Sequence, residues 1–336
     1  MMEFENPALP PRIVADAQLV AAIDRLKHIT GFVTTLTTLI DPRAQVFNRF
    51  DHVIRVLLLS MDLCKDSGAN VDEVAERVWL HDINRWVFAH NAEKSFFDQS
   101  QNIRRYLAPH SLGRDLILIE DLEAFHNKDF NALTLEGRIA LLADMITGIV
   151  EDPLLAICGL NVSPSFVPQV LLGELPLPVT TRVQVDILRA AAIALHVDRD
   201  IIAFSNLFSD IHRDAVSAYL DRFHGKLDVH GQDAREVYTL ARRIKVEFMQ
   251  PLIFPINNDG VCHGSWLKSQ VIGPLIQQMG YGEAEQLLLT LDEPSFVEFI
   301  LTLDLGSGSA LVPQDFIPDL DYVSKVQPAM RFIDIF

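Results

Sequence analysis

Cysteine is scarce in this chain of 336 residues. Its three cysteines are Cys64, Cys158 and Cys262, and no two of them have the Cys-x-x-Cys spacing. A disulfide framework needs many paired cysteines, and a zinc knuckle needs closely spaced ones. The sequence therefore argues against both, and we expect the three thiols to be reduced and structural.

Long apolar runs are also missing. No uninterrupted run approaches the ~20 residues that a membrane-spanning helix requires. The first residues also lack a basic stretch followed by an apolar one, which is the pattern of a secretory leader. We therefore expect neither a membrane protein nor a secreted one, and we predict a cytoplasmic location.

Basic residues are outnumbered by acidic ones. The chain has 28 lysines and arginines against 45 aspartates and glutamates, which gives a formal net charge of −17. This balance disfavours a protein that coats nucleic acid through its phosphates. A small anionic substrate would need positive charge close to its binding site. The candidates to supply it are a metal ion, Arg49, Arg85, Arg104–Arg105 and the group Arg242-Arg243-Lys245.

Few segments alternate between polar and apolar residues as strands do, although 49% of the residues are hydrophobic. This combination predicts a large all-α body rather than two unlike domains. We divide the chain into an N-terminal extension with a first helix (1–44), a core (45–160), a C-terminal helical region that completes a pocket (161–302) and a tail (303–336). The first dozen residues are expected to be extended, and apolar spacing predicts the first helix over Asp16–Ile40.

The C-terminal region shows helical spacing but no nameable motif. Helix should resume near Thr180-Thr181 after a proline-rich break, with a core stripe at Val185, Leu188, Ala192 and Leu195. A second break is expected between Phe254 and Gly264. The tail combines turn-forming residues with apolar ones, so it is a candidate arm for packing on a neighbouring surface, and a homo-oligomer is left open.

Three predicted helices carry residues of the metal-ligand type on or beside a buried face. His52 begins an apolar helix, and Asp144 interrupts the apolar stripe of Ile139, Leu142, Ala143, Ile146 and Val150. Asn70-Val71-Asp72-Glu73 resembles a capping box, so the pair His81-Asp82 should fall at the C-terminal end of the helix that follows. Each residue alone is more often a hydrogen-bonded core residue than a ligand, but together they favour a site.

Two imidazoles and two carboxylates would form a mixed nitrogen and oxygen site. Such a site suits a divalent metal (Mn, Fe, Co, Ni, Zn or Mg) and leaves positions open for water and a phosphate oxygen. The order along the chain is His52, then His81-Asp82, then Asp144. This order resembles the ligand pattern of the HD family of metal-dependent phosphohydrolases. The resemblance implies an HD-domain helical bundle with additional C-terminal helices, in which these four residues bind the metal.

A longer motif is similar to the deoxynucleoside triphosphate triphosphohydrolase branch of that family. Arg49 precedes His52 by three residues, and Phe88, His90 and Glu93 stand at the motif's later positions. The resemblance implies that Arg49 and His90 face substrate phosphates and that Glu93 orients His90. It also implies that Asp152, eight residues after Asp144, lies near a sugar hydroxyl. The expected substrate is thus a nucleotide, either a dNTP or a phosphorylated nucleoside analogue.

The chain departs from that branch at several positions. Asn84 replaces a glycine, Arg85 a histidine and Trp86-Val87 a proline-containing pair. Met145 stands where some members have a lysine, and Gly148 where an aromatic residue packs on the sugar. Arg85 itself becomes a candidate substrate contact. These changes leave phosphate cleavage intact but remove the basis for naming the nucleoside.

Two further histidines stand at positions that resemble those of ligands in a different branch of the HD family. His110 and His126 fall between His81-Asp82 and Asp144, as the additional ligands of dinuclear HD proteins do. That resemblance implies a second metal, and with it a phosphodiesterase or a mixed-valence di-iron oxygenase. The residue-level alternatives are a solvated turn for His110 and a helix cap for His126. A third alternative is a non-catalytic module that binds nucleotide for regulation.

Overall fold

A computed structural model describes eight segments of the chain. They are residues 9–29, 48–65, 67–93, 96–159, 179–198, 200–224, 226–245 and 271–302. No β-strand occurs among these residues, which confirms the prediction of an all-α fold. No helix among them is long and apolar enough to cross a membrane.

The described residues form α-helices and short 3₁₀ helices (η). In chain order they are α1 (Pro11–Val14), α2 (Ala17–Arg25), η1 (Leu26–His28), α3 (Arg49–Cys64), α4 (Val71–Leu80), α5 (His90–Glu93), α6 (Gln99–Leu107), η3 (Ser111–Arg114), α7 (Leu116–Asn127), α8 (Leu135–Gly159), α10 (Val179–Asp198), α11 (Ile201–Leu220), η4 (Asp221–Phe223), α12 (Gln232–Arg243), α15 (Gly273–Met279), α16 (Tyr281–Thr290) and α17 (Glu293–Thr302).

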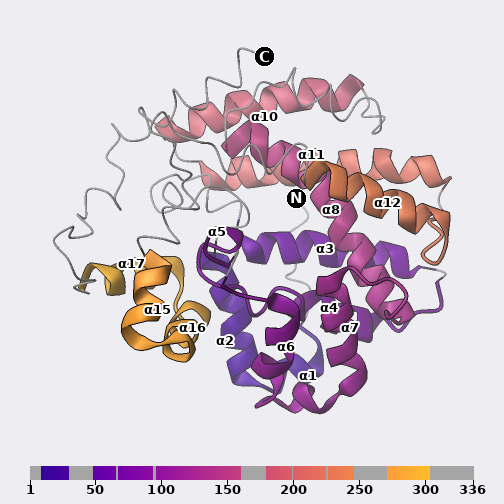
Figure 1. Ribbon diagram of the computed structural model, residues 1–336. Coiled ribbons are helices and arrows are strands. Elements are labelled where there is room, and N and C mark those ends of the chain that lie inside the picture. The colour runs from indigo at the N-terminus through magenta and orange to yellow at the C-terminus, as the bar shows by residue number, and fades with distance from the viewer. Residues whose placement is uncertain are drawn as a thin grey trace.

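Helix α8 is the centre of the fold. It packs against α3, α4, α7, α10, α11 and α12, and so joins the N-terminal helices to the later ones (Figure 1). Its predicted apolar stripe is buried: Ile139, Leu142, Ala143 and Ile146 have no exposed surface. Burial of this stripe is the main hydrophobic contribution that α8 makes to the core, and it fixes the direction in which Asp144 points.

The start of α4 is capped much as the sequence predicts. The side chain of Asn70 accepts hydrogen bonds from the backbone N–H groups of Asp72 and Glu73. The backbone N–H of Asn70, however, donates to Glu136 at the start of α8 (3.0 Å) rather than to Glu73. The cap therefore ties α4 to α8 as well as starting the helix, and α4 ends at Leu80, immediately before His81.

The N-terminal part differs from the prediction in two ways. Pro11–Val14 form a helical turn, with Pro11 at its first position, where a missing N–H costs nothing. The first long helix ends at Arg25 instead of continuing to Ile40. After η1, Ile29 is buried and extended, and its carbonyl accepts the N–H of Arg49 (2.9 Å). This contact with the start of α3 overrides the apolar spacing, and residues 30–47 lie outside the described part.

Helix resumes after the proline-rich segment close to where the sequence predicts. Helix α10 starts at Val179, and the stripe of Val185, Leu188, Ala192 and Leu195 is buried. The break expected between Phe254 and Gly264 and the tail 303–336 lie outside the described residues.

Helices α16 and α17 support the loop that follows His81-Asp82. The N–H of Val87 donates to the carbonyl of Leu288 (3.2 Å), and the N–H of Phe88 donates to Glu293 Oε1 (3.1 Å). Phe88 and Ala89 have φ values of 63° and 42°, in the region that non-glycine residues rarely adopt. Contacts with the C-terminal helices therefore help to hold a strained loop in place.

Candidate metal centre

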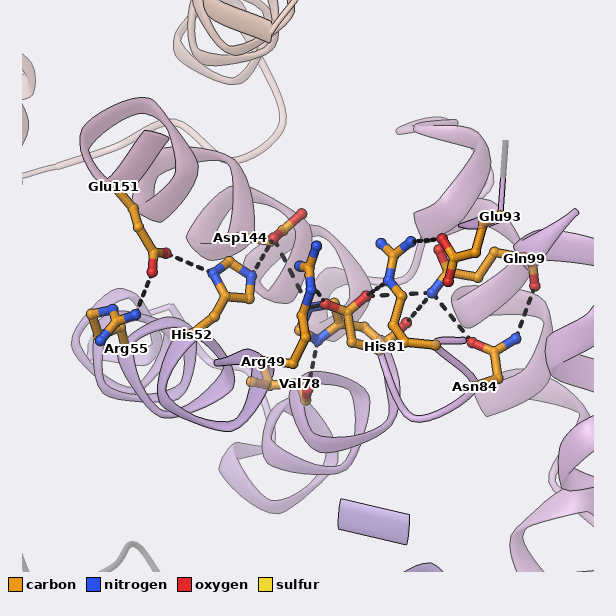
Figure 2. Close-up of polar contacts among 12 residues, drawn as sticks. Arg49, His52, Arg55, Val78, His81, Asn84, Glu93, Gln99, Asp144 and Glu151 are labelled. Carbon is orange, nitrogen blue, oxygen red and sulfur yellow. Dashed lines mark hydrogen bonds and ion pairs between the residues drawn. The ribbon is translucent and has the colours of Figure 1, made fainter. Parts of the chain in front are cut away.

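His81 is oriented for binding through one ring nitrogen. It is buried at the C-terminal end of α4, and its Nδ1 lies 2.6 Å from the carbonyl oxygen of Val78 (Figure 2). A carbonyl only accepts, so Nδ1 carries the proton and Nε2 has a free lone pair in the neutral ring. Nε2 is buried and has no hydrogen-bond partner. This is the arrangement of a metal-binding histidine.

His52 is held in the same manner from α3. Its Nδ1 lies 2.7 Å from Glu151 Oε2 on α8, and its Nε2 lies 3.2 Å from Asp144 Oδ1. Burial lowers the pKa of His52, but Glu151 and Asp144 outweigh it and raise the pKa to about 9. Two carboxylates on opposite sides of one imidazole require a cation at Nε2, either a proton or a metal ion.

Asp144 completes a group of three donors. One ligand atom from each of His52, His81 and Asp144 lies within 4.8 Å of the others, which is compact enough to hold one metal ion (Figure 2). The second oxygen of Asp144 lies 3.1 Å from Lys128 Nζ. Burial raises the pKa of Asp144, but Lys128 and then His52 lower it well below the usual range. The carboxylate is therefore ionised and ready to bind a cation.

Asp82 lies beside this group and is held by two arginines. Its Oδ2 is 3.0 Å from Arg49 Nη1 and 3.4 Å from His81 Nε2, and its Oδ1 is 2.8 Å from Arg85 Nε. Burial raises its pKa, but Arg85, His81 and Arg49 together keep it well below the usual range. Asp82 is thus an anion next to the three donors, and its role as a fourth ligand stays a prediction.

The donors open into a cavity of about 400 Å³. Arg49 lines it, and two of its guanidinium nitrogens, Nε and Nη2, are buried without a hydrogen-bond partner. Lys128, Tyr238, Arg242 and Lys245 line it as well. Helix α12 and the residues just after it therefore supply one wall together with two positive charges, Arg242 and Lys245. The cavity therefore joins a candidate metal site to several cations in a chain whose net charge is strongly negative.

Three other predicted residues also line this cavity: Arg85, His126 and Asp152. His126, near the end of α7, has a buried Nε2 without a hydrogen-bond partner. Burial, reinforced by Arg85, holds its pKa well below the usual value, so the ring is neutral at pH 7. Burial and then Glu151 raise the pKa of Asp152 to about 7. The cavity therefore offers a bound ligand a neutral imidazole and a carboxyl group whose pKa is close to pH 7.

Glu93 contacts the loop that carries the motif. Its carboxylate accepts hydrogen bonds from Arg85 Nη1 (2.7 Å) and from the backbone N–H of Trp86 (3.0 Å). Arg85 thereby links Glu93 to Asp82. His90 begins α5, but its side chain lies outside the described part, so the pairing of Glu93 with His90 stays a prediction.

The structure does not bring His110 to this group. It is buried just before η3, where its Nδ1 lies 2.8 Å from Asp16 Oδ2, and it lines a different cavity. This placement gives no support to His110 as a second-metal ligand. Arg104 is also elsewhere, in an exposed ion pair with Glu123 (2.7 Å).

Sequence reasoning missed Glu151, Lys128 and Gln99. Glu151 follows Asp144 by seven residues, two helical turns, so both lie on one face of α8; this spacing was a usable signal. Lys128 ends α7 in the left-handed conformation (φ 57°), which propensity does not predict. Gln99 opens α6 and donates to Asp82 Oδ1 (3.3 Å), a contact that only the tertiary fold creates.

Glu151→Gln should weaken metal binding by about 10–100-fold, because the amide cannot accept the His52 proton with the strength of a carboxylate. Glu151 also pairs with Arg55, so the folded fraction must be checked by circular dichroism. Glu123→Gln, on an exposed pair outside the cavity, is the matched control and should leave metal affinity unchanged. Equal affinities for the two variants, measured by calorimetric titration of Mn²⁺, would remove Glu151 from this role.

Metal affinity should also depend on pH. A proton and a metal ion compete for His52 Nε2, and the proton is held up to a pKa of about 9. Lowering the pH below this value should therefore weaken metal binding by at most about tenfold per pH unit. Titrations in two buffers of different ionisation enthalpy would report the released proton. Affinity that is constant between pH 6 and pH 8, with no proton release, would contradict this account.

A comparison with protein families gives one match. Residues 49–148 match the family described as HD domain. The matched segment contains His52, His81, Asp82 and Asp144, and it lies inside the predicted core 45–160. Searches of curated proteins and of solved structures give no match.

Proposed function

We propose that this protein hydrolyses a phosphoester or phosphoanhydride bond of a nucleotide, because residues 49–148 match the HD domain family, whose members are generally metal-dependent hydrolases. One observation carries the proposal. The three compact donors His52, His81 and Asp144 open into the same cavity as an arginine with two unmatched N–H groups. The candidate metal site and the N–H groups that could bind a phosphate oxygen are therefore adjacent.

The donor set fits a divalent metal such as Mn, Fe, Co, Ni, Zn or Mg. Both imidazoles have Nδ1 anchored and Nε2 directed at Asp144, and Asp82 is available beside them. When bound, the metal would polarise a phosphate group and lower the pKa of a water molecule. The metal identity does not follow from these donors, because nitrogen and oxygen ligands suit all six ions.

The arginines have separate tasks in this proposal. Arg49 neutralises charge on the transferred phosphoryl group through Nε and Nη2, because Nη1 already binds Asp82. Arg85 is bound to both Asp82 and Glu93, so it orients the aspartate and keeps it ionised. His90, oriented by Glu93, is the proposed acid or base for the nucleophile or leaving group, as the family resemblance implies. His126 is a second candidate, because its neutral ring lines the cavity.

Several features support a nucleotide as the substrate. Lys128, Arg242 and Lys245 provide positive charge around the cavity, which suits more than one phosphate. Tyr238 on the same wall offers an aromatic face for a base, and Asp152 offers an acceptor for a sugar hydroxyl. Gly148 leaves the space near Asp152 open, since a Cβ there would meet no atom closer than 3.9 Å.

A dinuclear phosphodiesterase or oxygenase is a second candidate function, favoured by His126 alone. His126 Nε2 lacks a partner in the cavity, whereas His110 lies at another cavity. Metal content separates the two readings: one ion per chain agrees with the mononuclear hydrolase, and two agree with the dinuclear one.

The proposal is tested by incubating metal-reconstituted protein with a panel of nucleotides and separating the products. Release of triphosphate or of phosphate from at least one nucleotide, dependent on added metal and lost on chelation, is the expected result. Binding of nucleotide without turnover in any of the six metals would favour a regulatory module and overturn the proposed activity.

A further inference from the structure

A second cavity is lined in part by Asn84, from the loop that follows His81-Asp82. It has a volume of about 550 Å³ and is lined by residues of α2, α6 and α16, among others. Its wall combines apolar side chains with the polar side chains of Arg25, Asn84, Asn102, Arg105, Tyr106, His110 and Glu285. A volume of this size is typical of sites for small molecules. Nothing in the proposed reaction uses it.

Arg25 is the unusual residue of this wall. It is only 8% exposed, and its guanidinium donates to two neutral acceptors, the carbonyls of Leu291 (3.1 Å) and Arg85. Its Nε is buried without a partner, and no carboxylate among the described residues is hydrogen-bonded to it. Burial lowers the pKa of Arg25, and more distant groups, Tyr106 and Glu93 first, offset this in part. A buried guanidinium without an adjacent anion is costly, so proteins usually pair it.

The other ionisable groups of the wall are already matched. Arg105 pairs with Glu285, and His110 contacts Asp16. Among the described residues of the wall, Arg25 is therefore the cation that has no anion in contact with it. The cavity therefore presents one buried positive charge together with neutral hydrogen-bonding groups from Asn84, Asn102 and Tyr106.

We propose that this second cavity binds a small molecule through an anionic carboxylate or phosphate group, with Arg25 as the counter-charge. The neutral polar side chains of the wall would then contact the rest of the ligand. The site is separate from the metal centre but linked to it by hydrogen bonds. Arg25 donates to the carbonyl of Arg85, whose side chain holds Asp82, and Asn84 accepts from Gln99, which also donates to Asp82. The proposal does not depend on the phosphohydrolase activity.

Binding can be tested without substrate or metal. Metal-free protein is titrated with inorganic phosphate and, separately, with acetate, while ¹H–¹⁵N spectra follow the arginine Nε–H groups and the amides of Tyr106 and His110. We expect saturable shifts at Arg25 and these amides with at least one probe. A response to phosphate alone would indicate a ligand with a phosphate group. A response to acetate alone would indicate a ligand with a carboxylate group.

Three variants localise the effect. Arg25→Lys keeps the charge but loses the planar group, so it should weaken binding about tenfold or more. Ala21→Phe should weaken binding similarly by occupying the cavity that Ala21 lines, while leaving Arg25 in place. Ala17→Phe is the matched control, because Ala17 is exposed on the same helix and does not line the cavity; it should bind as the wild type does.

The active-site variant Arg49→Lys should retain the second-site shifts, which separates this site from binding at the metal centre. If Arg25→Lys does not fold, the comparison of Ala21→Phe with Ala17→Phe still tests whether the anion binds in the second cavity. No saturable shift with either probe, or equal affinities for these two alanine variants, would overturn the proposal.

Discussion

His81→Ala should lose its bound metal and lower hydrolysis by more than about 10³-fold, because the metal supplies several kcal/mol of transition-state stabilisation. The variant removes a donor whose Nε2 is free while its Nδ1 is held by Val78. Asp144→Ala should have the same effect, since it removes the carboxylate that both imidazoles face. Elemental analysis of the purified variants and their turnover of the best nucleotide provide the measurements.

The matched control for this prediction is His28→Ala. His28 is exposed in η1 and does not line the cavity, so this variant should keep wild-type metal content and rate. Full metal occupancy in both His81→Ala and Asp144→Ala would show that the ion binds elsewhere and would contradict the assignment of these donors.

Arg49→Ala should lower kcat/KM by about 10²–10³-fold with the metal retained, which is the usual cost of removing one oxyanion donor. Arg49→Lys should fall between this variant and the wild type, because a lysine keeps the charge but cannot present two N–H groups in one plane. Arg49 Nε and Nη2 have no hydrogen-bond partner and are available to substrate. We therefore expect the fall in kcat/KM to exceed what the loss of the bond between Arg49 and Asp82 alone would cause.

Arg104→Lys serves as the control for the arginine series. Arg104 makes a two-pronged pair with Glu123 on the exposed surface, so the same substitution should be nearly silent there. A kcat/KM for Arg49→Lys equal to that of the wild type, at matched metal content, would remove Arg49 from the substrate site. The triphosphohydrolase reading would then lose its main support.

Much of the fold followed from local patterns. The apolar stripe of α8, the cap at Asn70 and the stripe of α10 depend on spacing within one helix, and these features are present as predicted. The end of α2 depends instead on the contact between Ile29 and Arg49, which are twenty residues apart in sequence. A single-helix pattern carries no information about such a contact, which explains why the predicted helix was too long.

The site was predictable to the same degree. His52, His81 and Asp144 lie together because α3 and α4 pack against α8, which carries Asp144, and their residue types and order had marked them as candidates. The residues that form hydrogen bonds or ion pairs with these donors and with Asp82 were harder to find. Glu151 could have been found from its seven-residue spacing to Asp144, whereas Lys128 and Gln99 reach the site only through the ends of α7 and α6.

The central claim is that His52, His81 and Asp144 hold one divalent metal. The most direct measurement is an anomalous difference map from crystals of protein reconstituted with Mn²⁺. The account predicts a peak within bonding distance of Nε2 of both histidines and of a carboxylate oxygen of Asp144, with or without Asp82. A fully occupied peak elsewhere in the chain, with none between these three side chains, would contradict it.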